Sequence, residues 1–113
     1  MKKLLAALVC AIFSLGASAA GNINAGKALA EKYACASCHG KDYNSPTEAT
    51  YPKLAGQHRD YLEHALTGYK RGDKGYGRNN AVMTGQVKPL TNQDIKDLAA
   101  YFHSLPGTLV THR

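Results

Sequence analysis

The sequence contains only three cysteines, and a single pair of them, Cys35 and Cys38, is closely spaced. Because a structural zinc site usually takes four protein ligands, the lack of a second pair argues against a zinc module. The chain shows no run with the strict apolar–polar alternation of a strand, and no internal repeat. Its formal net charge is +6, but the basic residues form no concentrated stripe, so nucleic-acid binding is not expected.

The chain also lacks an apolar run long enough to cross a bilayer, which needs roughly 20 residues. Its N-terminus has instead two lysines, an apolar run over residues 4–15 and four small residues, 17–20. This is the pattern of a secretory signal peptide. We therefore predict a signal peptide over residues 1–20, cleaved after Ala19 or Ala20, and export to the periplasm. An uncleaved anchor is the alternative.

Cleavage after residue 20 would leave 93 of the 113 residues as one small domain, 21–113. Cys10 would be lost, so Cys35 and Cys38 would be the two remaining cysteines. Lys2 and Lys3 would be lost too, and the formal charge would fall from +6 to +4. An oxidising compartment permits a disulfide between the two remaining thiols, but the residues around them indicate a different chemistry.

Residues 35–39 read Cys-Ala-Ser-Cys-His, the C-x-x-C-H pattern by which a c-type haem is attached. Each thiol can form a thioether with one vinyl group of the porphyrin, and the histidine that follows can ligate the iron. A thioredoxin-type redox pair is the alternative. Such a pair normally follows a strand and opens a helix, whereas this motif is expected to close a helix. The adjoining histidine and the export signal favour haem attachment.

Three segments have the apolar spacing of amphipathic helices. The first follows Asn22, a favourable N-cap. The second begins near Gln57 and ends at Gly72, and the third follows Thr91, which forms a variant capping box with Asp94. The apolar faces of the three helices are Gly26, Leu29, Ala30 and Tyr33; Leu62, Ala65, Leu66 and Tyr69; and Ile95, Leu98, Ala99 and Phe102.

Residues 71–90 show no regular pattern and are rich in glycine and asparagine. An irregular loop of this length in a compact domain is usually either functional or disordered. It contains Met83, the only methionine besides the initiator. The sequence therefore predicts a long functional loop that carries one soft sulfur donor.

His39 supplies one axial ligand of the iron in this interpretation, and the other can come from Met83, His58, His64 or His103. These three histidines lie in polar stretches of helices, where side chains are usually exposed, whereas a long loop can fold Met83 over the opposite haem face. One soft sulfur donor in a long loop fits iron ligation by one histidine and one methionine. With both axial positions filled, the iron has no open position, so we predict one-electron transfer and no enzyme activity.

These motifs together resemble a small bacterial monohaem class I cytochrome c. The resemblance covers the predicted mature chain: GKALAEKYACASCHG, then YPKLAGQ, then a methionine loop, then LTNQDIKDLAAYFHSL. It implies an all-α fold of three main helices and long loops around one covalently bound haem c. It also implies thioethers at Cys35 and Cys38, iron ligation by His39 and Met83, and a Pro52 carbonyl that accepts a hydrogen bond from the ligand histidine.

In the same fold, Gly26 and Tyr101 match the crossing of the first and last helices. The function implied is that of a soluble, monomeric electron carrier in a periplasmic respiratory or oxidative chain, without a stable membrane anchor. Its transient redox partners would be a membrane oxidase, a cytochrome complex or a periplasmic dehydrogenase. Two other classes stay open: a haem sensor or peroxidase with a weak sixth ligand, and an electron-entry module of a larger complex.

The segment before the methionine is basic. Asp73 is the one acid among four cations, Lys70, Arg71, Lys74 and Arg78. Runs of this kind are often no more than a solvated loop. Two functional alternatives are that Arg78 turns inward to a haem propionate, or that the cluster faces outward and steers an acidic redox partner.

Overall fold

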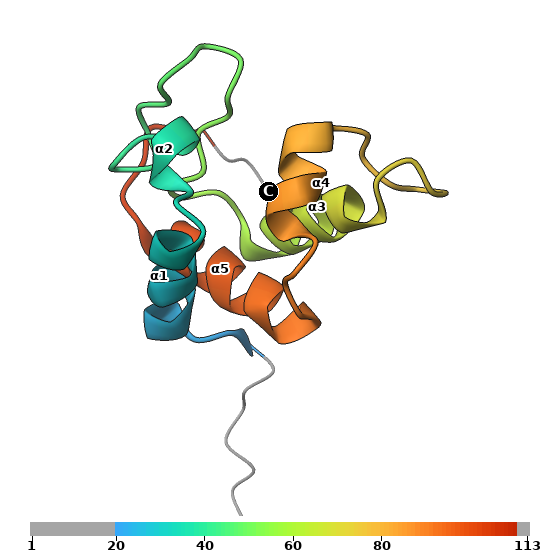
Figure 1. Cartoon of the computed structure of the whole chain (residues 1–113). Coiled ribbons are helices and arrows are strands. Elements are labelled where there is room, and N and C mark those ends of the chain that lie inside the picture. Colours follow the sequence, from blue (N-terminus) through green and yellow to red (C-terminus); the bar gives the residue numbers. More distant parts are fainter. Residues whose placement is uncertain (1–19, 111–113) are drawn as a thin grey trace, which may run out of the picture.

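The computed structural model describes residues 20–110, which contain helices and no strand. In Figure 1 the helices are α1 (Ile23–Lys32), α2 (Ala36–His39), α3 (Arg59–Arg71), α4 (Ala81–Val87) and α5 (Asn92–Ser104). The predicted all-α class with three main helices, α1, α3 and α5, is confirmed. The signal-peptide prediction falls, apart from Ala20, outside the described residues. From residue 20 to residue 110, no helix is both long and apolar enough to cross a membrane.

The helix ends follow from short-range side-chain chemistry. Asn22 Oδ1 accepts the Ala25 N–H over 2.9 Å at the start of α1. At the start of α5, Thr91 Oγ1 accepts the Asp94 N–H (3.1 Å) and Asp94 Oδ2 accepts the Thr91 N–H (2.9 Å), which is a reciprocal capping box. Helix α3 ends at Gly72, whose φ of +63° lies in the left-handed region that favours glycine. All three predicted ends are confirmed.

The prediction of an irregular loop over residues 71–90 is wrong in its second half, because residues 81–87 form helix α4. Asn80 is its N-cap, and the Asn80 Oδ1 accepts the Met83 N–H over 3.0 Å. Seven residues make only two turns, which is too short for an apolar repeat to be visible in the sequence. Met83 therefore lies in the first turn of a helix rather than in a loop.

Helix α1 packs closely against α5, and the contact is made at a glycine. A Cβ atom built on Gly26 would lie 2.0 Å from the Asp97 carbonyl oxygen and 2.7 Å from Tyr101 Cβ. No side chain fits in that space, so the expected crossing at Gly26 and Tyr101 is confirmed. The Asn22 N–H donates to Asp97 Oδ1 over 2.8 Å, which ties the start of α1 to α5.

The core of the described chain is built largely from small or medium side chains. Its buried apolar residues are Ala30, Tyr43, Ala55, Leu62, Ala65, Leu66, Val87, Leu90, Ile95, Leu98, Ala99, Ala100 and Phe102. In Figure 1, α2 lies beyond the end of α1 on one side and α4 lies beside α3 on the other, with α5 between α1 and α3. The fold thus places the C-x-x-C-H motif and Met83 on two separate elements.

Candidate haem-binding site

The C-x-x-C-H motif forms a helical turn of its own. Helix α1 ends at Lys32, and Ala34 takes a positive φ of +51°, which interrupts the helix before the motif. Cys35 is the N-cap of α2 and His39 its last residue. The expectation that the motif closes the preceding helix is thus modified, because a short break separates α1 from α2.

The two thiols are placed for a shared partner. Cys35 and Cys38 are three residues apart on one helical turn, which puts them on the same face. Both are free and half-buried. Burial raises the pKa of the Cys35 thiol. Two reduced sulfurs on one face, rather than a disulfide, match a ligand that takes two thioethers.

His39 is 6% exposed, and its ring is held by a backbone carbonyl. The His39 Nδ1 lies 2.8 Å from the Pro52 carbonyl oxygen. A carbonyl oxygen can only accept, so Nδ1 carries the proton in this pair, and Nε2 of the neutral ring keeps a lone pair for a metal. This hydrogen bond fixes both the tautomer and the ring orientation.

The loop that carries Pro52 is anchored to the core by Tyr43. The Tyr43 carbonyl accepts the N–H groups of Leu54 (2.8 Å) and Ala55 (3.0 Å). The Tyr43 ring is 5% exposed and packs against Phe102 of α5 at a centroid distance of 4.8 Å. Burial raises the pKa of Tyr43 to about 12. The carbonyl that orients His39 is therefore fixed to the helical core.

The start of the same loop is a tight turn. A Cβ atom on Gly40, whose φ is +88°, would lie 2.1 Å from the Ser45 carbonyl oxygen. The Asp42 carboxylate accepts the backbone N–H groups of Asn44 and Ser45, each over 2.9 Å. The bond from Asn44, with a smaller contribution from Ser45, lowers the pKa of Asp42. The chain can therefore reverse direction immediately after His39.

Met83 lies on α4, half-buried and packed against the hydrophobic core. Its backbone is fixed by the Asn80 cap, and the next residue, Thr84, donates its hydroxyl to the Tyr69 carbonyl of α3 over 2.8 Å. Val82, by contrast, is 63% exposed. The side chain of Met83 thus packs against the core although its neighbour faces solvent.

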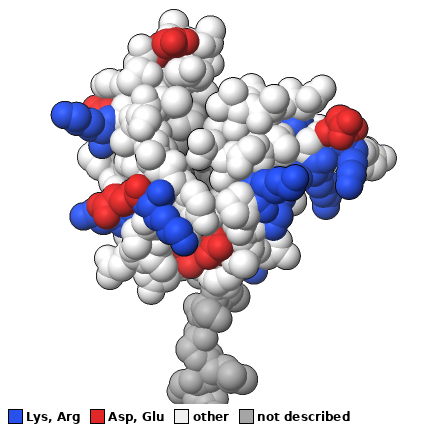
Figure 2. All heavy atoms as spheres, viewed as in Figure 1, with Lys and Arg blue, Asp and Glu red and all other residues white. Residues whose placement is uncertain are grey.

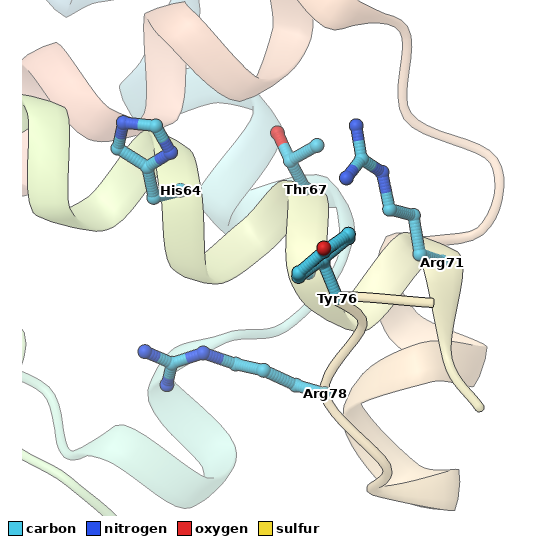
Figure 3. Close-up of a pocket in the computed structure, with 6 residues that line it drawn as sticks. His64, Thr67, Arg71, Tyr76 and Arg78 are labelled. Carbon is cyan, nitrogen blue, oxygen red and sulfur yellow. The ribbon is translucent and has the colours of Figure 1, made fainter. Parts of the chain in front are cut away.

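The three alternative histidine ligands lie elsewhere. His103 is exposed, with its Nδ1 2.8 Å from the Gln57 carbonyl oxygen. His58 is half-buried and precedes α3, where it borders a surface cavity with Arg59, Asp60 and His103. His64 is exposed on α3 and lines a cavity of about 320 Å³ with Thr67, Gly68, Arg71, Tyr76 and Arg78 (Figure 3). Neither cavity includes a residue of the C-x-x-C-H motif.

The residues present fit a covalently bound haem. The motif offers two free thiols on one face of a turn, together with a buried imidazole whose Nδ1 is already engaged. A haem-independent metal site has less support, because residues 20–110 contain no group of three or more His, Cys, Asp or Glu arranged to hold an ion. The donor set is that of a C-x-x-C-H haem attachment site.

Comparison with known protein families also indicates a haem protein, over most of the chain. The family model Cytochrome c matches residues 23–106. The chain belongs to the cytochrome c family. Haem c is therefore its cofactor, attached through the cysteine pair Cys35 and Cys38 of the C-x-x-C-H motif.

Individual relatives in the cytochrome c family are similar over most of this chain. Cytochrome c4 of Stutzerimonas stutzeri is 41% identical over 96% of this chain and 53% of its own length. Cytochrome c-553 of Nitratidesulfovibrio vulgaris is 35% identical over 93% of this chain and 100% of its own length. The crystal structure of reduced recombinant cytochrome c4 from Pseudomonas stutzeri superposes with a TM-score of 0.69 at 40% identity, covering 80% of this chain and 48% of that chain.

The chain thus spans about half the length of the cytochromes c4 that it matches. The family, the cofactor and the cysteine pair could all be predicted from the residues of this chain. The contact that holds α4 could not be predicted, because it joins Tyr69 and Thr84, which are 15 residues apart. Only the asparagine at position 80 gave a local signal, as a possible cap.

Proposed function

We propose that this protein is a one-electron carrier whose haem iron is ligated by His39 and Met83. The observation that carries the proposal is the hydrogen bond from His39 Nδ1 to the Pro52 carbonyl, because it leaves Nε2 as the nitrogen that can ligate the iron. The haem, when bound, supplies reversible one-electron oxidation and reduction. The chain's own part is to orient one imidazole and one thioether and to keep both away from water.

The burial of His39 and the packing of Met83 against the core favour electron transfer over catalysis. His39 is buried, and Met83 is half-buried against the core. A thioether opposite an imidazole raises the reduction potential relative to two imidazoles, since the soft sulfur favours the ferrous state. A haem sensor or peroxidase would need an open or weakly filled position in place of Met83, so we do not favour that alternative.

We further propose that residues 1–20 are a cleaved signal peptide and that residues 21–113 act in the periplasm. The basic, apolar and small-residue pattern of the N-terminus supports this. A carrier of this kind would exchange electrons with a membrane oxidase, a cytochrome complex or a periplasmic dehydrogenase through a short-lived interface. We propose that it does so as a monomer.

The test of the ligand is Met83→Ala. The variant should keep its covalent haem but lose the long-wavelength band between thioether sulfur and ferric iron. Its reduction potential should fall by on the order of 0.1 V, a fraction of the range of about 0.8 V that axial ligands set. Redox titration and visible spectroscopy of the purified protein measure both effects.

Val82→Ala, next to Met83 but 63% exposed, is the matched control and should behave like the wild type. The histidine variants His58→Ala and His64→Ala should also keep the band. If Met83→Ala retains the wild-type spectrum and potential, another residue is the ligand, and the histidine variant whose spectrum and potential differ from those of the wild type identifies it.

The four cations of the basic segment before Met83 do not have the same surroundings. Lys70 Nζ donates to the Leu90 carbonyl oxygen, and Arg78 lies over two tyrosine rings. Arg71 and Lys74 remain exposed. In Figure 2, Lys and Arg side chains gather on the side of the molecule formed by α3, α4 and the segment between them, with a single acidic group nearby. Two of the four cations are therefore the better candidates for steering a partner.

We expect the rate of electron transfer to an acidic partner to fall with salt, on the order of tenfold between low and high ionic strength, because steering acts mainly on association. Arg71→Glu/Lys74→Glu should be slower at low salt and less sensitive to salt. Lys27→Glu/Lys32→Glu on α1 makes the same charge change elsewhere and is the control. Stopped-flow measurement with a native partner tests this. Equal effects of the two double variants would mean that net charge matters rather than this surface.

A further inference from the structure

Arg78 is the best-anchored residue of the segment that joins α3 to α4. Most side chains between Gly72 and Asn80 are exposed, and Tyr76 is 100% exposed. Arg78 instead lies along α3, with its guanidinium directed back toward the turn that carries His64 (Figure 3). The contacts of Arg78 with α3 explain this placement.

The backbone of Arg78 is seated on a glycine of the helix. The Arg78 N–H donates to the Gly68 carbonyl oxygen over 2.8 Å. A Cβ atom on Gly68 would lie 3.0 Å from Arg78 Cγ and 3.3 Å from Cδ, so the aliphatic part of Arg78 packs directly on this glycine and would have to shift if residue 68 carried a side chain. The helix surface thus forms a seat for this one side chain.

The guanidinium is held by two aromatic rings. Arg78 Cζ lies 5.6 Å from the ring centroid of Tyr61 and 5.5 Å from that of Tyr69. Both distances are within the range of a favourable cation–π contact. Interaction with Tyr61, and next with Tyr69, raises the pKa of the Arg78 guanidinium. Two side chains of α3 therefore stabilise the positive charge of Arg78.

The same region of α3 holds the start of α4. The Tyr69 carbonyl accepts the Thr84 hydroxyl over 2.8 Å, and Asn80, two residues after Arg78, caps the Met83 N–H. Arg78 thus lies between two fixed points, the Tyr69 ring on one side and the Asn80 cap on the other. If Arg78 moved away from α3, the Asn80 cap and the first turn of α4, where Met83 lies, would move with it.

We propose that Arg78 is a positioning residue for the sixth ligand: by clamping residues 72–80 onto α3, it holds the first turn of α4 so that Met83 stays on the haem iron. This inference rests on the proposed role of Met83. Arg78 itself does not touch the iron in this proposal. It lowers the frequency with which the α4 turn moves away and leaves the iron open to an external ligand.

The test is the affinity of the oxidised holoprotein for imidazole, which must displace Met83 to bind. Arg78→Gln should bind imidazole about tenfold more tightly than the wild type, the size expected for loss of a partly buried cation–π clamp. Lys74→Gln removes an exposed cation from the same segment and should leave the affinity unchanged. Arg78→Lys keeps the charge but not the planar group, and should lie between wild type and Arg78→Gln.

A second, milder variant and a stability measurement separate the role of Arg78 from a general loss of folding. Tyr61→Leu removes one ring of the clamp from a side chain that is 49% exposed, and it should raise imidazole affinity in the same direction with a smaller effect. Urea unfolding measured in parallel separates ligand displacement from global stability. A merely structural role would shift the unfolding midpoint without changing imidazole affinity measured well below that midpoint, and that result would overturn the proposal.

Different results would overturn the ligand role of Met83 and the positioning role of Arg78. If Met83→Ala has the spectrum and imidazole affinity of the wild type, the proposed ligand is wrong. If Met83→Ala differs from the wild type but Arg78→Gln and Lys74→Gln bind imidazole equally well, the ligand stands and the positioning role of Arg78 is wrong.

Discussion

Cys35→Ala/Cys38→Ala should lose both the covalent haem and the folded state. Five of the thirteen buried apolar residues between positions 20 and 110 are alanines, so the side chains alone form a small core. A domain of about 93 residues already has a modest core. In this family the large apolar haem fills the centre of the domain. Without the thioethers, binding to the native state no longer stabilises it.

Acid–acetone extraction, which removes non-covalent haem, and limited proteolysis measure the two losses. Cys10→Ala is the matched control, because the predicted signal peptide carries Cys10 away; its purified product should keep haem, mass and protease resistance. Intact mass of that product also tests cleavage after Ala19 or Ala20. A protease-resistant, cooperatively folding form of the double variant without haem would contradict the prediction.

The parts of the fold that could be predicted are those whose physical cause is local. Asn22 caps α1 through a residue three positions away, and Thr91 and Asp94 cap each other across the same interval. Such side-chain bonds are visible in sequence because the partners are adjacent in the chain. The C-x-x-C-H spacing is local for the same reason.

The parts that could not be predicted depend on contacts between distant residues. In the sequence, Asn80 is one of several asparagines and glycines of an expected loop, yet it is the N-cap of α4, and the Thr84 hydroxyl further holds this helix to the Tyr69 carbonyl. The bond between His39 and Pro52 joins residues thirteen positions apart, and only the family resemblance indicated it. Nothing in the residue order shows that Arg78 would lie against Gly68 rather than in solvent.

Gly26→Leu should destabilise the protein by at least about 3 kcal/mol, at the upper end of the typical cost of overpacking. The reason is that the obstacle is backbone rather than a side chain that could rotate away. Even a Cβ atom at residue 26 would lie 2.0 Å from the Asp97 carbonyl oxygen, so α1 must move away from α5. That movement would also strain the bond from the Asn22 N–H to Asp97.

A matched pair of alanine variants separates the crossing from helix propensity. Gly85 lies in helix α4, and a Cβ atom there would meet nothing within 4 Å. Gly85→Ala should therefore stabilise the protein by up to about 1 kcal/mol, the usual gain of alanine over glycine in a helix. Gly26→Ala makes the same chemical change and should have the opposite sign, because the clash outweighs the propensity.

Urea unfolding of the holoprotein gives both values. Equal signs for the two variants, or an unchanged midpoint for Gly26→Leu, would mean that α1 can shift on α5 at little cost and that Gly26 does not set the crossing.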